Sequence, residues 1–174
     1  MQTGQSQTPV FQVQLVGLNA ETNLYNGAFN IRPDVTIDKV GKTDLIIIPA
    51  ISGNIPEELR RNEAFLPWIT DHYKKGAEVT SLCMGAFLLA STGLIKGEKC
   101  TTHWMAADAF RQMFPDVNLV TEKIITDQNG IYTSGGAYSF LNMIIYLVEK
   151  YCGRHVAIFC SKMFEIEIDR YDQL

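Results

Sequence analysis

A cysteine and a histidine each end a short segment of this sequence that has the character of a strand. Cys83 lies in the stretch Ser81-Leu-Cys-Met-Gly85, with a small residue two positions before it and a glycine two positions after it. Small flanking residues are typical of a nucleophile elbow, a strand-to-helix turn so sharp that larger side chains would collide. At such a turn the free N–H groups of the following helix lower the thiol pKa below the ~8.5 of a free cysteine. The alternative interpretation is an unreactive cysteine buried at a strand end.

His103 closes the stretch Cys100-Thr-Thr-His-Trp104, in the next strand-like segment along the chain. The carboxyl ends of parallel strands meet at one edge of a sheet, so the imidazole of His103 can reach the thiol of Cys83. A cysteine with a histidine in reach is the minimal nucleophile–base unit. The alternative is a histidine that only hydrogen-bonds a backbone carbonyl. Cys83 and His103 are therefore candidates for nucleophile and base, or for a sensor thiol and its partner.

Four residues near these positions are candidates for ligand contacts: Gly53, Asn54, Met84 and Trp104. The turn 52–54 follows a buried segment and offers backbone N–H groups to an oxyanion, or it is only a turn. Met84 and Trp104 adjoin the cysteine and the histidine, where they supply apolar walls. Trp104 also shares a helical spacing with apolar residues that is more typical of a core, namely Phe110, Met113 and Phe114.

The remaining histidines and cysteines give no convincing metal site. Cys152 and His155 stand one helical turn apart with Cys160 beyond them, a poor zinc set that we interpret as packing residues. We expect neither a metal nor a cofactor. His72 stands beside two lysines, which is typical of a solvated helix end.

Strand-like and helix-like segments alternate along the chain, which predicts an α/β fold with a mostly parallel sheet flanked by helices. Segment 44–49 is continuously apolar, as in a strand covered on both faces, and Asn129-Gly130 predicts a hairpin. The other expected strands are 10–16, short pieces within 27–40, 77–82, 99–102, 119–126 and 131–133. The expected helices begin at 56 (ending at 75), 85, 104, 137 and 154.

Composition limits the class of protein. The chain has 174 residues, 47% hydrophobic and 20% charged, which fits one globular domain over 1–174. Its net charge of −4 lacks the basic excess of a DNA-binding surface. Its four cysteines form no CxxC pair, and its N-terminus does not resemble a signal peptide. No apolar run reaches the ~18 residues of a membrane span. We therefore expect a cytoplasmic protein without membrane contact.

Three stretches together resemble the ThiJ/PfpI family, which has a flavodoxin-like, class I glutamine amidotransferase-like fold: 82–90, 97–104 and 131–137. The resemblance covers roughly residues 10–164. The motifs Cys-Met-Gly-Ala-Phe and Thr-Thr-His-Trp are similar, more narrowly, to motifs in the N-terminal sensory domain of AraC-type transcriptional regulators. Members of that subgroup carry a helix-turn-helix DNA-binding domain next, and 161–174 resembles the lead-in to it.

The sequence departs from the family pattern in two places. Peptidase-like members have a histidine directly after the cysteine, where this chain has Met84. The family's opening strand, with a glutamate that hydrogen-bonds the cysteine, has no counterpart, so no third catalytic residue is assigned. We interpret the chain as a domain fragment, or as one whose true start lies upstream. These departures favour an effector- or redox-sensing domain over an enzyme. The alternative is a hydrolase, hydratase or glyoxalase with a cysteine nucleophile.

The resemblance also implies partners. Tyr25, Phe29 and Ile31 lie on a segment similar to the family's dimer surface, so we expect a homodimer. The other expected partners are an unknown small-molecule effector and DNA, the latter only through a domain that this chain does not contain.

Overall fold

The computed structural model describes residues 9–24, 27–168, 170 and 172. Tyr25, one of the residues expected on a dimer surface, lies outside the described residues. The chain separates into two compact units, residues 1–41 and 42–174. That residues 1–174 form a single domain stays a prediction.

The first unit contains two small pairs of strands. Strand β1 (Val16–Gly17) runs parallel to β4 (Val35–Thr36), and β2 (Thr22–Leu24) runs antiparallel to β3 (Phe29–Ile31). The expected strand over 10–16 is wrong except at its last residue. A segment with an alternating pattern forms a strand only where a neighbouring strand hydrogen-bonds its backbone groups. Here the N–H of Leu15 instead donates to the side-chain carboxylate of Asp34 at 2.7 Å.

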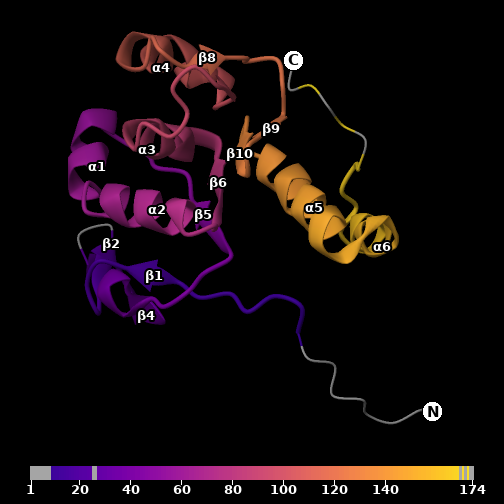
Figure 1. Ribbon diagram of the computed structural model, residues 1–174, viewed down its shortest axis with the longest axis horizontal. Coiled ribbons are helices and arrows are strands. Elements are labelled where there is room, and N and C mark those ends of the chain that lie inside the picture. The colour runs from indigo at the N-terminus through magenta and orange to yellow at the C-terminus, as the bar shows by residue number, and fades with distance from the viewer. Residues whose placement is uncertain (1–8, 25–26, 169, 171, 173–174) are drawn as a thin grey trace. The chain divides into compact units, whose positions relative to one another are not determined.

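The second unit is built on a four-stranded sheet in the order β5-β6-β10-β9 (Figure 1). Strands β5 (Leu45–Ile48), β6 (Glu78–Leu82) and β10 (Ile131–Ser134) are parallel, and β9 (Ile125–Gln128) is antiparallel to β10. The predicted hairpin joins β9 to β10 through Asn129 and Gly130, which have φ values of 53° and 75°. The mostly parallel α/β sheet is thus confirmed.

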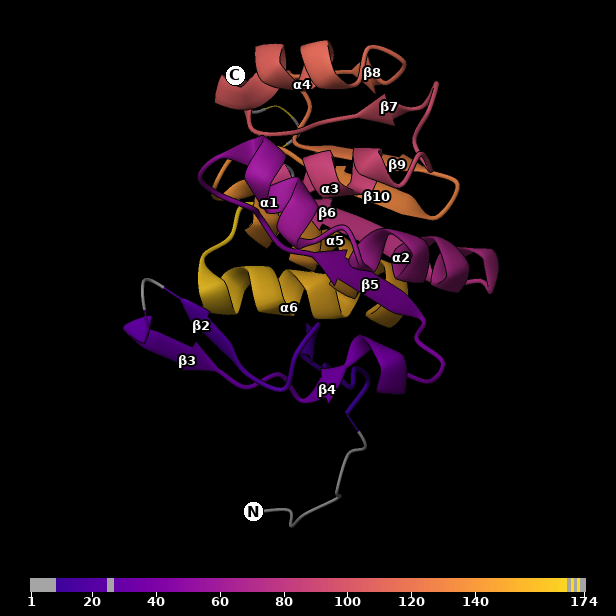
Figure 2. The same ribbon diagram turned by 90° about the vertical axis from the view of Figure 1, so that its left-hand side faces the viewer.

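Helices cover both faces of this sheet (Figures 1 and 2). Helices α1 (Ile55–Arg61), α2 (Phe65–Lys74) and α3 (Ala86–Ser91) lie on one face. Helix α5 (Ser139–Cys152) lies on the other, and α6 (Arg154–Phe164) packs on α5. One continuous helix was expected over 56–75, but α1 ends where the amide of Asn62 donates to the carbonyl of Glu58 at 2.8 Å.

A smaller layer stands beside β9. Strand β7 (Lys99–Cys100) pairs in parallel with β8 (Asn118–Leu119), and the turn η4 (Trp104–Ala106) leads into α4 (Ala107–Met113). The strands expected over 99–102 and 119–126 are therefore shorter. Thr101, just after β7, is held by its side chain and by the donation of its N–H to the Thr133 hydroxyl at 2.7 Å.

The main core lies between the sheet and helices α1 to α4. Its fully enclosed members include Val79, Phe87, Leu89 and Phe110. Ile47 points to the other face and is 41% exposed, so the expectation that this strand is covered on both faces is wrong there. Strand β5 has β6 as its partner and stands at the end of the sheet order. Within the described part of the chain, no helix has the length and hydropathy that a bilayer span requires.

Candidate functional site

The predicted sharp turn is present at the carboxyl end of β6. Cys83 follows the last strand residue and has φ 52°, in the left-handed region that residues with a β-carbon rarely adopt. The turn η3 (Cys83–Gly85) then leads directly into α3. Such a backbone conformation costs on the order of 1–3 kcal/mol and clusters at functional sites. The strain marks Cys83 as the centre of the candidate site.

Close packing explains the glycine after the cysteine. A β-carbon on Gly85 would stand 2.5 Å from the carbonyl oxygen of Pro49 and 2.7 Å from that of Ile48. The turn therefore passes against the end of β5 at a distance that only glycine allows. Ser81 is buried, and its hydroxyl has no hydrogen-bond partner among the described residues. The available space thus requires the glycine of the motif, and it encloses the serine completely.

The electrostatic expectation for the thiol is wrong. Burial raises the pKa of Cys83 above its ordinary value of 9.0, and the N–H of Met84 offsets only part of this increase. Helix α3 has six residues, so its terminal dipole is small. Desolvation of the thiolate therefore outweighs the help from the backbone, and the cysteine remains a thiol at neutral pH.

Thr102 connects the second half of the site to the first. Its side chain is fully buried, and its hydroxyl donates to the carbonyl oxygen of Cys83 at 3.0 Å. This bond fixes the loop after β7 against the elbow and brings His103 next to it in the chain. Sequence reasoning missed this positioning role. The available signal was the pair of β-branched hydroxyl residues before His103 at a strand end.

The imidazole of His103 is turned toward its own loop. Its Nδ1 accepts from the N–H of Met105 at 3.2 Å, and its ring stacks on Trp104 with centroids 5.8 Å apart. In a neutral imidazole with Nδ1 as acceptor, the other nitrogen carries the proton. His103 therefore has no spare lone pair to take the thiol proton in this arrangement. Across the described residues, no hydrogen bond joins it to Cys83.

The four candidate ligand contacts have different surroundings. Gly53 has φ 98° in the turn after β5, and the side chain of Asn54 caps α1 by accepting from the N–H of Glu57 at 3.1 Å. Met84 is partly buried against the core, whereas Trp104 is 52% exposed. The Asn54 side chain is thus committed to the helix, while Trp104 presents an open aromatic surface beside His103. Ligand contact by these residues stays a prediction.

One other sequence interpretation has a clear structural outcome. His72 is buried, with its ring centroid 4.6 Å from that of Trp68. The interpretation of His72 as part of a solvated helix end is therefore wrong. Burial lowers the pKa of this histidine. The cause is that α2 turns this residue toward the core rather than its neighbouring lysines. In the described ranges, no group of three histidine, cysteine or acidic side chains is placed to hold a metal.

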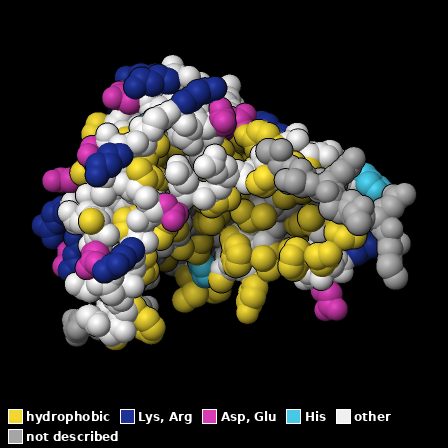
Figure 3. All heavy atoms as spheres, turned by 90° about the horizontal axis from the view of Figure 1, so that it is seen from below, with side chains coloured by type: hydrophobic (Ala, Val, Ile, Leu, Met, Phe, Trp, Pro, Cys, Tyr) yellow, Lys and Arg dark blue, Asp and Glu magenta, His cyan; other side chains and the backbone are white. Residues whose placement is uncertain are grey.

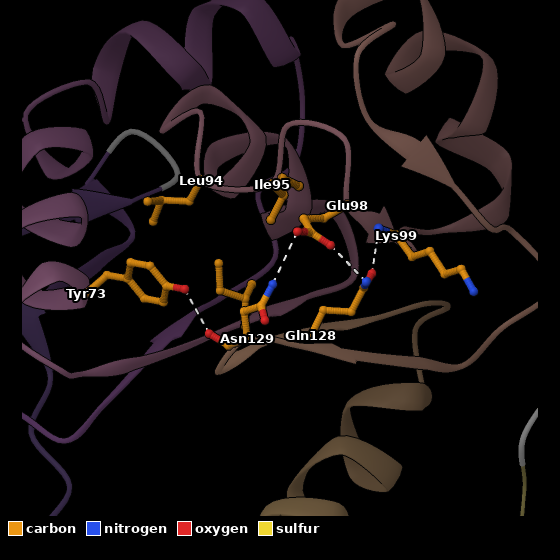
Figure 4. Close-up of a pocket in the computed structure, with 8 residues that line it drawn as sticks. Tyr73, Leu94, Ile95, Glu98, Lys99, Gln128 and Asn129 are labelled. Atoms are coloured by element: carbon orange, nitrogen blue, oxygen red, sulfur yellow. Dashed lines mark hydrogen bonds between the residues drawn. The ribbon is translucent and has the colours of Figure 1, made fainter.

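Two hollows of the molecule lie away from Cys83. Figure 4 shows a pocket at the β9–β10 hairpin. Its volume is about 30 Å³, and the side chain of Glu98 in its lining accepts from Gln128 at 2.8 Å and from Asn129 at 3.2 Å. It has room for about one water molecule. A wider groove lies between β9, α5 and the chain near Ile168. Neither hollow is lined by a candidate site residue.

Comparison with known proteins assigns the chain to a family. The DJ-1/PfpI family pattern matches residues 7–150. The chain belongs to the DJ-1/PfpI family. It is 29% identical over 143 residues to the HTH-type transcriptional regulator GbdR of Pseudomonas aeruginosa, covering 82% of this chain and 38% of GbdR. It is 26% identical over 147 residues to the isonitrile hydratase of Pseudomonas putida, covering 83% of this chain and 61% of the hydratase.

A solved structure agrees with these relatives. A transcriptional regulator protein from Vibrio parahaemolyticus superposes with a TM-score of 0.78 at 26% identity, covering 88% of this chain and 80% of that one. The family resemblance and the flavodoxin-like fold are therefore confirmed. The chain spans less than two thirds of the length of GbdR and of the hydratase. DJ-1/PfpI domains thus occur in both regulators and enzymes.

Proposed function

We propose that this DJ-1/PfpI domain is the effector- or redox-sensing part of an AraC-type transcriptional regulator. The observation that carries the proposal is the state of the thiol and the imidazole. Burial raises the pKa of Cys83, and the Nδ1 lone pair of His103 is taken by Met105. Nucleophilic catalysis needs an activated thiol with a base in reach, whereas a binding site needs only apolar walls and a few polar anchors.

The likeness to GbdR supports the same function, because it covers 82% of this chain. In the proposed protein, a small effector or an oxidant acts at Cys83, with His103 and Trp104 beside it. The change then passes to a separate DNA-binding domain. The homodimer and the cytoplasmic location expected from the sequence belong to this proposal.

An enzyme is the second candidate, supported by the likeness to the isonitrile hydratase and by the strained backbone at Cys83. In that case Cys83 would attack the substrate carbon and His103 would accept the thiol proton. The imidazole would first have to leave its hydrogen bond with Met105. The reaction class would be a hydrolysis, a hydration or a glyoxalase-type rearrangement.

A thermal-shift screen of small metabolites and mild oxidants tests the sensing proposal. We expect at least one compound to raise or lower the Tm of the wild-type chain and to lose this effect in Cys83→Ala. Cys160→Ser is the matched control, because it also removes a partly exposed thiol but lies on α6. A compound effect that survives Cys83→Ala and disappears in Cys160→Ser would contradict the proposal.

DNA binding by this chain alone provides a separate check. With a net charge of −4, we expect no salt-sensitive retardation of duplex DNA, because duplex affinity depends on Lys and Arg neutralising phosphates. Tight retardation that weakens with salt would place the DNA-binding function in this domain instead.

A further inference from the structure

The wider of the two hollows, between β9, α5 and the chain near Ile168, combines apolar side chains with charged ones of both signs. Large hydrophobic side chains also gather on the face shown in Figure 3, but with few charged side chains among them. The volume of the hollow is about 390 Å³. Small-molecule sites in proteins have volumes of about 300–1,000 Å³, so this hollow has the size of a ligand site.

Two rows of side chains, one from each wall, line this hollow at regular spacings. Alternate positions of a strand share one face, and so do positions three or four apart on a helix. The row from the β9 wall is Lys123, Ile125 and Asp127, and the row from the α5 wall is Asn142, Ile145, Tyr146 and Glu149. The chain after α6 adds Ile168 and Arg170. These residues define the α5–β9 groove.

The middle of the α5–β9 groove is apolar. Ile125 and Ile145 lie between the polar members of their rows, and Ile145 is only 3% exposed. Ile168 is partly buried. The hydroxyl of Tyr146 donates to the carboxylate of Asp127, which leaves the tyrosine ring as a further apolar surface. The groove therefore favours a ligand with an apolar middle.

The end of the groove where β9 and α5 finish is acidic. Asp127 lies near the end of β9, beside Tyr146. Glu149 lies one helical turn beyond Tyr146 on α5, and it pairs with Arg154 at 2.9 Å. Asp127 is exposed and has no ion-pair partner among the described residues. It is therefore the carboxylate that a bound cation would meet.

The opposite end of the groove is basic. Lys123 lies just before β9, and its ammonium donates to Asp172 at 3.0 Å, with both side chains about half exposed. Near the start of α5, the side-chain amide of Asn142 donates to the carbonyl of Glu167 at 2.7 Å. These two bonds place Arg170 at this end, because it lies between Glu167 and Asp172 in the chain. Within the described chain Arg170 is exposed and in no ion pair, so it can receive a bound carboxylate.

The distance between the two ends matches a short peptide. Lys123 and Asp127 are four strand positions apart, or about 13 Å. Asn142 and Glu149 are seven helical positions apart, or about 10 Å. Three residues of extended chain span about 10 Å. A free tripeptide therefore carries an ammonium and a carboxylate at a separation close to that of the acidic and basic ends.

We propose that the α5–β9 groove binds a peptide of about three residues with free termini and apolar side chains. Its carboxylate lies at Arg170 and its ammonium at Asp127, and its middle packs on the apolar floor. The ion pairs already present at the two ends are partly exposed, so they hold their partners weakly. The groove does not include Cys83, and the proposal is therefore independent of the sensing proposed for that residue.

Isothermal titration calorimetry with the full chain and the peptide Ala-Leu-Ala tests this proposal without any variant. The free peptide should bind at one site per chain. Amidation of its carboxylate and acetylation of its amine should each weaken binding at least about tenfold, because each removes a charge-assisted contact. The dipeptide Ala-Leu is too short to span the two ends, and it should also bind at least about tenfold more weakly.

Charge variants test which terminus lies at which end. Arg170→Glu should weaken binding of the free peptide at least about tenfold but change that of the amidated peptide little, because the group that Arg170 contacts is then absent. Asp127→Asn should show the same relation to the acetylated peptide. Arg60→Glu on α1 and Asp108→Asn on α4 are matched controls, because they change the same charges at exposed positions outside the groove lining. Both should leave binding unchanged.

Other outcomes would overturn the proposal. An ω-aminooctanoate has the same two charges at a similar separation but no peptide groups, so binding of this compound without binding of Ala-Leu-Ala would assign the groove to ω-amino acids. Circular dichroism confirms that each variant is folded. Equal binding of free and capped peptides, no binding of the free peptide, or its loss in a folded Cys83→Ala variant would each contradict a peptide site in this groove.

Discussion

The central sheet has one edge where strand β6 begins and an opposite edge where β6 ends. The polar groups at these two edges differ in how their hydrogen bonds are satisfied. Where β6 begins, the carboxylate of Glu78 accepts from Lys150 at 2.7 Å and from the hydroxyl of Tyr151, and Lys150 also donates to the hydroxyl of Tyr132. Where β6 ends, Cys83 has a left-handed backbone and the buried hydroxyl of Ser81 has no partner in the described chain. The first edge stabilises the fold, and the second stores strain.

This difference teaches how the fold supports a site. Strain at one edge persists only when the surrounding structure holds it in place. Here, the Glu78 network fixes α5 to the start of the sheet, and Thr102 fixes the loop of His103 to the elbow. Exposed aromatic side chains also follow strands at the second edge, where Trp104 is 52% exposed and Tyr138 is 75% exposed. Breaking each edge should therefore have a different consequence.

The largest effect is expected at the strained edge, from Gly85→Ala. The added methyl group would press against two backbone oxygens that cannot move without shifting β5, which should lower the free energy of unfolding by about 3 kcal/mol or more. Gly41→Ala is the control, because nothing lies within 4 Å of its added β-carbon. Urea unfolding measures both variants. Equal stability of the two would show that the turn is not held by close packing.

At the edge where β6 begins, Glu78→Gln should lower the free energy of unfolding by about 1–3 kcal/mol, because the Lys150 ammonium then faces a neutral amide in place of a carboxylate and the ion pair is lost. Lys150→Met should cost a similar amount, and the double variant should cost less than the sum because the partners form one network. A double-mutant cycle by urea unfolding measures this coupling. Fully additive losses would mean that Glu78 and Lys150 do not stabilise the fold as a pair.

The same network predicts how stability depends on pH. Burial alone would raise the pKa of Glu78, but hydrogen bonds from Lys150 and Tyr151 outweigh it and leave the pKa below its ordinary 4.5. This carboxylate therefore contributes stability above pH 4.5 that is lost as pH falls through its lowered value. The hydrogen bonds that Lys150 donates to Glu78 and Tyr132 raise its pKa above 10.5, so its contribution is lost only as pH rises beyond that value.

The Tm of the wild-type chain, measured as a function of pH, should show a plateau. The plateau should extend from the pH at which Glu78 becomes protonated to the pH at which Lys150 loses its proton. In Glu78→Gln the acid-side loss of Tm should become shallower, because the variant has no carboxylate to protonate. An unchanged acid limb in this variant would assign the pH dependence to other groups.

The smallest effect concerns the thiol chemistry of the strained edge. Because burial raises the pKa of Cys83, its alkylation rate should keep rising with pH to beyond 9.0. It should still exceed the rate at Cys100, which is fully buried and has a pKa raised to about 12 by that burial. His103→Gln should change the Cys83 profile little. Peptide mass spectrometry measures both rates, and a midpoint below ~8.5 that rises in His103→Gln would show a coupled pair.

Local features of the site were predictable from the sequence, and long-range ones were not. The small residues Ser81 and Gly85 predict the sharp turn at Cys83, because the turn restricts the size of the side chains close to it in the sequence. The Asn129-Gly130 hairpin was predictable for the same reason. The burial of His72 and the raised pKa of Cys83 depend on which distant side chains enclose them, which spacing alone does not encode. The exposure of Ile47 likewise depends on what covers a face of the sheet.

Turnover at Cys83 tests most directly whether the strained edge senses or catalyses. The purified chain and its Cys83→Ala variant are assayed with amide, isocyanide and 2-oxoaldehyde substrates at neutral pH, below the ordinary thiol pKa of 9.0. With the thiol protonated and the Nδ1 of His103 occupied, we expect both proteins to stay near the background rate with every substrate. A Cys83-dependent kcat/KM above about 10⁴ M⁻¹s⁻¹, within the ordinary range of enzymes, would contradict this and make catalysis the primary role.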